Sequence, residues 1–194
     1  MINTTNIALF ASGSGTNVEN ICKYFKDNSQ INIACILCNN PKAYVIKRAE
    51  LLNVDFWVFS RENFNDKYLF LSFLKKKNVD FIILAGFLWL VPQFLIDEYP
   101  NKIINIHPAL LPKYGGKGMY GDAVHNAVFN NKEVETGITV HYVNSNYDEG
   151  QIIFQKKVNI ENDETPSSIA EKVHKLEYDY YPKVIEKILL KLKK

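Results

Sequence analysis

The fold is decided by residues 80–107, which read DFIILAGFLWLVPQFLIDEYPNKIINIH. Two apolar runs, Asp80–Ala85 and Lys102–His107, enclose a short helical segment, Pro92–Glu98, whose first residue is a proline, as is common at the start of a helix. The first run is apolar without alternation, which is typical of a strand buried on both faces of a sheet. The order strand, helix, strand therefore predicts two parallel strands of an α/β fold.

The same alternation of strands and helices extends toward the N-terminus. Further strands are predicted at Asn6–Phe10, Ile31–Leu37 and Phe56–Phe59. Helices are predicted to follow them at Asn17–Asp27, Ala43–Leu52 and Glu62–Lys77. Because buried strands need cover on both sides, the chain is predicted to form a doubly wound, mostly parallel, Rossmann-like sheet with helices on both faces.

The last third of the chain follows a different pattern. Two strands, Ile138–Val143 and Gln151–Val158, are separated by a loop too short for a crossover helix, which predicts a C-terminal antiparallel hairpin. A helix is expected from Thr165–Ser168 onward, with a kink or a break at Pro182. With no repeat or linker in the sequence, we expect a single domain over residues 1–194.

The composition excludes several classes of protein. Of the 194 residues 47% are apolar, and the formal net charge is +2, which favours neither nucleic acid nor a membrane surface as a partner. No apolar run reaches about eighteen residues, and no signal peptide is evident, so a cytoplasmic protein is expected. Cys35 and Cys38 form a C-x-x-C pair, but their spacing in a strand sends them to opposite faces. We therefore expect core thiols rather than a zinc or redox site.

The turn after the first predicted strand has the residues of a phosphate-binding loop. It reads ASGSGTN, Ala11–Asn17, and Gly13 and Gly15 would let an anion approach the backbone amides at the start of the next helix. The third glycine of a dinucleotide-binding turn and a Walker lysine are both missing, so a monophosphate is favoured. The alternative is an ordinary glycine-rich turn capped by Ser14 or Thr16.

Asn105 and His107 are the candidate reactive pair. Residues two apart in a strand share a face, and both would project at the carboxyl edge of the sheet, where open α/β folds bind ligands. An amide that holds a carbonyl oxygen and an imidazole that moves a proton suit acyl transfer. The alternative is a core histidine at a strand end. Asp148 is the candidate carboxylate partner of His107, although it could be only a turn residue.

The other histidines carry weaker signals. His125 and His174 fall in helical patterns and are expected to be surface or packing residues. His141 alternates along a strand, and the pattern does not decide which face it occupies.

Four motifs in order over most of the chain carry a family resemblance. They are ASGSGTN, LAGF at 84–87, NIHPALLPKY at 105–114 and TGITVHYVNSNYDEGQII at 136–153. With them the chain resembles the phosphoribosylglycinamide formyltransferase family of the 10-formyltetrahydrofolate transferase superfamily, enzymes of purine biosynthesis. The resemblance implies that the amine of glycinamide ribonucleotide attacks the formyl carbon of 10-formyltetrahydrofolate, with no metal. Asn105 and His107 would stabilise the oxyanion, His107 would move the proton, and Asp148 would orient His107 and raise its pKa.

The resemblance also implies two sets of binding residues. The ribotide would contact Gly15, Thr16, Asn17, Glu177, Tyr178, Asp179 and Tyr180. The folate would contact Arg61, Leu88, Trp89, Leu90, Val91, Asn105, Asn144, Ser145, Asn146, Tyr147 and Asp148. Trp89 stands where the family usually has arginine, so folate contact there would come from the backbone or from stacking. The GGKGMYG segment after LLPKY also departs from the family's usual P-G.

Several alternatives stay open. Methionyl-tRNA and sugar formyltransferases and the formyltetrahydrofolate deformylases carry a further domain, so the chain length favours the ribotide enzymes, acting as a monomer or homodimer on small molecules. A formyltetrahydrofolate hydrolase or a sugar-amine formyltransferase could use the same folate. A non-catalytic folate- or nucleotide-binding module is a different class. A small dehydrogenase is disfavoured by the missing third glycine.

Overall fold

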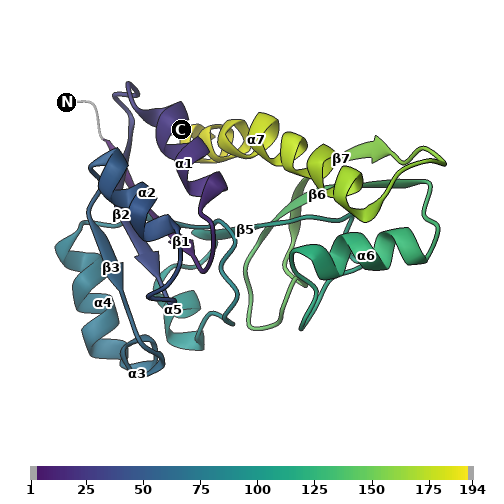
Figure 1. Ribbon diagram of the computed structural model, residues 1–194. Helices are drawn as coiled ribbons and strands as arrows, with labels where there is room; N and C mark the ends of the chain where they lie inside the picture. Colours follow the sequence, from purple (N-terminus) through teal and green to yellow (C-terminus); the bar gives the residue numbers. More distant parts are fainter. Residues whose placement is uncertain (1–3, 192–194) are drawn as a thin grey trace.

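The computed structural model describes residues 4–191, in which one sheet has the strand order β3-β2-β1-β4-β5-β6-β7 (Figure 1). The strands are β1 (Thr5–Ala11), β2 (Ile31–Cys38), β3 (Phe56–Val58), β4 (Phe81–Leu84), β5 (Ile103–His107), β6 (Glu135–Tyr142) and β7 (Ile152–Asn159). From β3 to β5 every neighbouring pair is parallel, whereas β5–β6 and β6–β7 are antiparallel. The predicted mostly parallel sheet and C-terminal antiparallel hairpin are confirmed.

Helices cover both faces of this sheet, as predicted. They are α1 (Thr16–Phe25), α2 (Val45–Leu52), α3 (Arg61–Asn65), α4 (Lys67–Lys76), α5 (Gln93–Glu98), α6 (Asp122–Asn130) and α7 (Pro166–Lys191). Buried residues of α1, α2, α6 and α7 pack in one core, and buried residues of α3, α4 and α5 pack in a second core on the opposite face. Alternate residues of each central strand enter the two cores, because successive side chains of a strand point to opposite faces.

The cysteines are core residues. Cys38 belongs to the first of these cores and Cys35 to the second, so the two thiols lie on opposite faces of β2, as predicted. Burial raises the pKa of Cys22 and of Cys35 to about 12. Neutral buried thiols of this kind are inert packing groups rather than a reactive pair.

The prediction of one helix over Glu62–Lys77 is wrong. The chain forms α3 and α4 instead, separated by Asp66 in an extended conformation. Asp66 accepts a hydrogen bond from the Leu69 amide, which caps α4, while Ser60 and Asn63 form a capping box at the start of α3. Two sets of N-terminal caps within a few residues favour two short helices over one long one.

Of the kink or break predicted at Pro182, the break is wrong, because α7 runs through this residue. Pro182 is buried, and the adjacent Tyr181 donates a buried hydrogen bond of 2.9 Å from its hydroxyl to the Leu84 carbonyl of β4. An interior proline costs roughly 3 kcal/mol in an isolated helix. The packing of α7 against α1, α6 and the hairpin strands offsets that cost.

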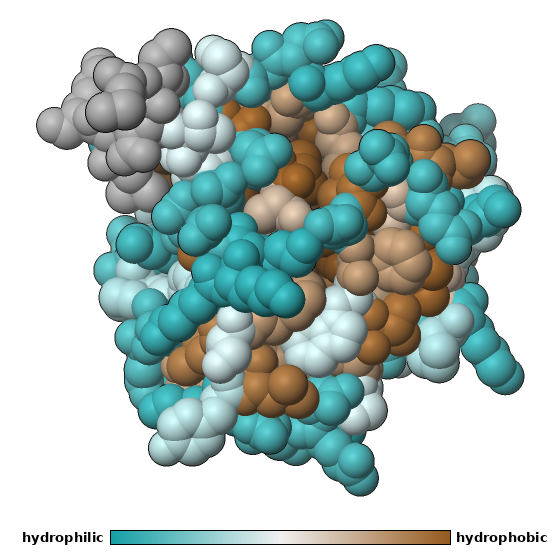
Figure 2. Space-filling model, turned by 90° about the vertical axis from the view of Figure 1, so that its left-hand side faces the viewer, coloured by the Kyte–Doolittle hydropathy of each residue, from teal (hydrophilic) through white to brown (hydrophobic). Residues whose placement is uncertain are grey.

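One edge of the sheet is the short strand β3. It holds three residues, and Figure 2, which looks onto this side of the molecule, shows apolar surface broken up by polar side chains. A short edge strand offers few free backbone groups to another chain. Among residues 4–191, no helix is both long and apolar enough to cross a bilayer.

The strand order reverses between β1 and β4, which leaves a crevice above their carboxyl ends. The two loops that flank it are held together there. Ser12 donates its amide to the Gly86 carbonyl at 2.9 Å, and its hydroxyl accepts the Leu88 amide at 2.9 Å. The crevice is therefore bordered by the glycine turn on one side and by the segment after β4 on the other.

Candidate active site

A cavity of about 600 Å³ opens at this reversal of strand order. Its wall is formed by the turn after β1, residues 84–91, the end of β5, the loop 116–121, residues 141–148 and one side of α6 and α7. Ligand sites of open α/β sheets lie at this edge. Predicted reactive residues and predicted binding residues therefore line the same cavity.

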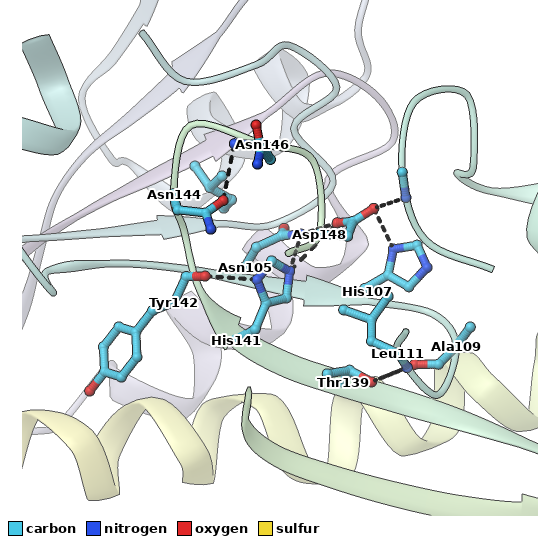
Figure 3. A network of polar contacts seen from close by, with 12 residues as sticks. Asn105, His107, Ala109, Leu111, Thr139, His141, Tyr142, Asn144, Asn146 and Asp148 are labelled. Carbon is cyan, nitrogen blue, oxygen red and sulfur yellow. Dashed lines mark hydrogen bonds and ion pairs between the residues drawn. The ribbon is translucent and has the colours of Figure 1, made fainter. Parts of the chain in front are cut away.

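Asn105, His107 and Asp148 come together in this cavity, as the sequence predicted (Figure 3). His107 Nδ1 lies 3.4 Å from Asp148 Oδ2, and Asn105 Nδ2 lies 3.5 Å from Asp148 Oδ1. His107 is 3% exposed. The end of β5 supplies the first two side chains, and the loop between β6 and β7 folds back over them to supply the third.

His141 completes this cluster, and the sequence analysis did not assign it. It pairs with Asn105 across the antiparallel β5–β6 register, and its Nε2 lies 3.2 Å from Asn105 Nδ2 and 3.5 Å from Asp148 Oδ1. Its Nδ1 lies 2.8 Å from the Tyr142 carbonyl, which can only accept, so Nδ1 carries the proton. Its Nε2 faces both the Asn105 amide and the Asp148 carboxylate. Knowing that β6 pairs with β5 would have revealed this residue.

The tautomer of His107 is also set by a backbone carbonyl. Its Nε2 lies 2.7 Å from the Tyr114 carbonyl oxygen, so Nε2 donates and carries a proton. Nδ1, which faces Asp148, is therefore the atom that gains or loses a proton. A hydrogen bond to one ring nitrogen decides the chemistry available at the other.

The net pKa of His107 runs opposite to the predicted increase. Burial lowers its pKa below the usual 6.5, and this outweighs the nearby Asp148 charge, which raises it. Asp148 raises the pKa of His107, as predicted, but this increase is smaller than the decrease caused by burial. Burial raises the pKa of Asp148 itself, yet the hydrogen bond to His141, the charge of His107 and the Gly116 amide outweigh burial and bring its pKa below 3.8.

The loop that follows His107 is fixed to β6 by one threonine. The Thr139 hydroxyl donates to the Ala109 carbonyl at 2.6 Å and accepts the Leu111 amide at 3.0 Å (Figure 3). Farther along, the Gly116 amide donates to Asp148 Oδ2 at 2.9 Å. The GGKGMYG segment, which departs from the family pattern, thus contributes directly to holding the carboxylate.

The glycine turn lies at the cavity, with Gly13, Gly15, Thr16 and Asn17 in its wall. Its carbonyls point toward α2: the Gly13 oxygen accepts the Val45 amide at 3.1 Å, and the Ser14 oxygen accepts Arg48 Nε at 2.9 Å. The first N–H groups of a helix have no partner within the helix, so those of α1 are available to an anion. The predicted phosphate contact of this turn stays a prediction.

We predict that Gly15→Val destabilises the fold, whereas Gly13→Ala weakens substrate binding. Gly15 has φ +75°, and a Cβ there would overlap the side chain of Val45 and lie 2.9 Å from its Cα. Strain and overpacking together should cost about 2–5 kcal/mol. A Cβ on Gly13 meets no atom within 4 Å and would enter the cavity. Urea unfolding and KM for each substrate separate the two effects; similar unfolding midpoints for both variants would contradict this assignment.

Only the first of the predicted residues 177–180 belongs to the cavity wall. Glu177 is 6% exposed, lines the cavity and accepts a hydrogen bond of 3.0 Å from Asn17 Nδ2. Tyr178 and Asp179 are exposed on α7, and the ring of Tyr180 stacks on Phe154 of β7. One face of a helix can reach the cavity, so a run of four consecutive residues cannot all do so.

Glu177 should make stability depend on pH. Burial raises its pKa from 4.5 to about 7. Because the folded pKa is the higher one, stability present below pH 4.5 is lost as pH rises toward 7, by about 3 kcal/mol in total. Glu177→Gln cannot titrate, so its free energy of unfolding should gain on that of the native chain by this amount between pH 4.5 and pH 8. Parallel urea-unfolding profiles for the two proteins would contradict the raised pKa.

The apolar part of the wall contains most of the predicted folate residues. Leu88, Trp89, Leu90 and Val91 line the cavity together with Asn105, Asn144, Asn146, Tyr147 and Asp148. Ser145 is exposed and does not line it. Arg61 does not line it either; its guanidinium lies over the Trp89 ring, 3.7 Å from the ring centroid. Arg61 can therefore act on this wall through Trp89, by a cation–π contact. Within the described part of the chain, no group of three His, Cys, Asp or Glu side chains is arranged to hold a metal.

Comparisons with known proteins agree with this geometry. Residues 5–185 match the family model described as formyl transferase. A phosphoribosylglycinamide formyltransferase of Bacillus subtilis is 38% identical over 94% of this chain and 93% of its own, and the enzyme of the same name from Haemophilus influenzae is 34% identical over 93% and 85%. The crystal structure of glycinamide ribonucleotide transformylase 1 from Geobacillus kaustophilus has a TM-score of 0.87 and 35% identity, covering 96% of this chain and 100% of that one. The chain therefore belongs to the formyl transferase family.

Proposed function

We propose that this chain transfers the formyl group of 10-formyltetrahydrofolate to the amine of glycinamide ribonucleotide, a step of de novo purine biosynthesis. The observation that carries the proposal is the cluster of Asn105, His107 and Asp148 inside one cavity, which a glycine turn and an apolar wall also line. Relatives that carry the name of this activity match nearly the whole chain, which supports the choice of substrates.

The two sides of the cavity suit two different substrates. The glycine turn and Glu177 are polar and present helix amides, which fits a phosphorylated ribose. Residues 88–91 are apolar and include the ring of Trp89, which fits the flat ring system of a folate. The reactive cluster lines the same cavity, so a substrate bound at either side can reach it.

The reaction needs a stabilised oxyanion and a path for one proton. When the amine adds to the formyl carbon, the Asn105 amide donates to the oxygen that becomes negative. Once protonated at Nδ1, His107 places a positive charge beside this site, and Asp148 stabilises the imidazolium that forms. Release of the tetrahydrofolate amine takes up a proton, and the attacking amine loses one, so the cluster only shuttles a proton and none is consumed. His141, acting through Asn105, is proposed as a positioning residue.

A single assay tests the activity. Purified protein is mixed with 10-formyltetrahydrofolate, and tetrahydrofolate formation is followed with and without glycinamide ribonucleotide. Formyl transfer that depends on the ribotide supports the proposal. Formate release at the same rate without the ribotide would indicate a hydrolase instead, and tight binding of folate with no turnover would indicate a binding module.

We also infer that the chain works as one domain in the cytoplasm, as a monomer or homodimer, on small molecules alone. The three buried thiols fit a reducing compartment. The balanced net charge of +2 favours neither nucleic acid nor a membrane surface as a partner.

A further inference from the structure

Three consecutive residues contact both members of the proton-transfer pair. The Tyr114 carbonyl accepts from His107 Nε2 at 2.7 Å, and the Gly116 amide donates to Asp148 Oδ2 at 2.9 Å. Between them, Gly115 lies against the carboxylate residue, because a Cβ on it would come within 3.2 Å of Asp148 Cβ. The placement of this short segment therefore decides the tautomer of the imidazole and the orientation of the carboxylate that faces it.

The backbone of Tyr114 is strained. Its φ is 57°, in the left-handed region, which a bulky side chain rarely adopts. Glycine or asparagine would take this conformation more readily. A residue stays in such a conformation only where its surroundings hold it there, and such residues cluster at active sites. The contacts that hold Tyr114 are therefore also the contacts that keep its carbonyl on His107.

The side chain of Tyr114 makes these contacts outside the cavity. Its hydroxyl lies 2.8 Å from Glu133 Oε1 and 3.0 Å from Asn131 Nδ2. Lys113 Nζ lies 2.9 Å from the same Glu133 oxygen, and the hydrogen bonds from Lys113 and Tyr114 lower the pKa of Glu133 below 4.5. Glu133 is therefore ionised at neutral pH and can only accept. The Tyr114 hydroxyl donates to Glu133 and accepts from Asn131, so both of its hydrogen-bonding roles are used.

These partners belong to the turn between α6 and β6. Asn131 directly follows α6, and Glu133 lies two residues before the start of β6. The loop after His107 is thus fastened at two points, first by Thr139 of β6 and then by this turn. Because the phenol and the carbonyl belong to one residue, release of the phenol from the turn would also release the carbonyl from the imidazole.

We propose that Tyr114 and Glu133 are positioning residues, which hold the Tyr114 carbonyl on His107 from outside the cavity and so keep the ring in its reactive tautomer. The inference rests on the proposed function and adds to it two residues that do not line the cavity. With Nε2 held as the donor, Nδ1 is free to take up a proton beside Asp148. A ring that no carbonyl holds can also place its proton on Nδ1, and in that tautomer Nδ1 accepts none.

The test removes the hydroxyl and its acceptor in turn. Tyr114→Phe keeps the ring and loses the hydroxyl, whereas Glu133→Ala removes the acceptor. Tyr24→Phe is the matched control, because the Tyr24 hydroxyl also lies 2.8 Å from a glutamate oxygen, that of Glu186, but this pair joins α1 to α7. For each protein, kcat and both KM values are measured, and the NMR shifts of the ring nitrogens report the tautomer of His107.

Tyr114→Phe should lower kcat by about 10-fold, with both KM values changed less than about twofold, because the reacting ring is less well oriented. The ring-nitrogen shifts should show a proton on Nε2 of His107 in the native protein and a mixture of tautomers in the variant. Glu133→Ala should behave alike. The double variant should be no slower than the slower single variant, since both residues act through one hydrogen bond. Tyr24→Phe should match the native chain in kcat and in ring shifts.

Native kcat and native ring shifts in a folded Tyr114→Phe protein would overturn the assignment. So would a rise in KM alone, or a loss of kcat with unchanged ring shifts, because the hydroxyl would then act by another route. Thermal unfolding checks that each variant folds, and Glu133→Ala carries the test if Tyr114→Phe does not fold. Failure of the proposed function is recognised separately, because the native chain would then form no product from the ribotide. In that case the ring shifts still decide whether Tyr114 and Glu133 hold His107.

Discussion

His107→Ala should reduce kcat by about 10²–10⁴-fold, the range expected when a positioned proton-transfer group is removed. The ring lies at the cavity, with its titrating Nδ1 facing Asp148 at 3.4 Å, so its loss removes the proton carrier and the positive charge beside the oxyanion together. KM for both substrates should change much less than kcat, because no binding residue is removed. Single-turnover kinetics with saturating substrates measure the effect.

The stability of that variant needs its own control. His107 is 3% exposed and donates to the Tyr114 carbonyl at 2.7 Å, so alanine leaves a buried carbonyl unpaired and should cost about 1–3 kcal/mol in unfolding free energy. His107→Asn keeps a side-chain donor but cannot titrate near neutral pH. Near-native turnover in a folded His107→Asn protein would return His107 to the role of a core histidine.

The central sheet could be predicted because its signal is local. Continuous apolar runs such as Asp80–Ala85 report a strand buried on both faces whatever its neighbours are, and the loop before Gln151 is too short for anything but a hairpin. The errors arose where local and tertiary effects compete. At Asp66 a cap split a helix that the periodicity joined, and at Pro182 packing preserved a helix that the proline should interrupt.

Some residues of the candidate site could be predicted from the sequence, and others could not. Asn105 and His107 share a strand face, so their proximity follows from their spacing. His141 reaches them only through the β5–β6 register, and His125 lines the cavity only through the position of α6. Neither can be read from spacing along the chain. Burial was the other missing quantity. The net pKa of His107 is lowered because the ring is enclosed, and enclosure depends on loops from distant parts of the sequence.

Asp148→Asn should lower the pKa of His107 further and reduce kcat at neutral pH by about 10²–10⁴-fold. Asp148 now opposes the effect of burial by favouring the imidazolium, so removing its charge leaves burial unopposed. The substitution is well matched to the backbone. Asp148 has φ 59°, a left-handed conformation that asparagine tolerates, and an amide oxygen can still accept the Gly116 amide.

The pH dependence of this variant separates charge from shape. NMR titration of His107 in the native and Asp148→Asn proteins should show the lower pKa in the variant. Because the folded pKa of Asp148 is below 3.8, the native carboxylate contributes stability above that pH, and this is lost as pH falls through the folded pKa. The asparagine variant should lack this part of the acid dependence. If His107 titrates identically in both proteins, Asp148 has no electrostatic contact with it and is only a turn residue. The partner of His107 in proton transfer would then have to be another group. The next candidate is His141, and Asn105→Ala, which removes the amide beside the His141 ring, would be the variant to measure.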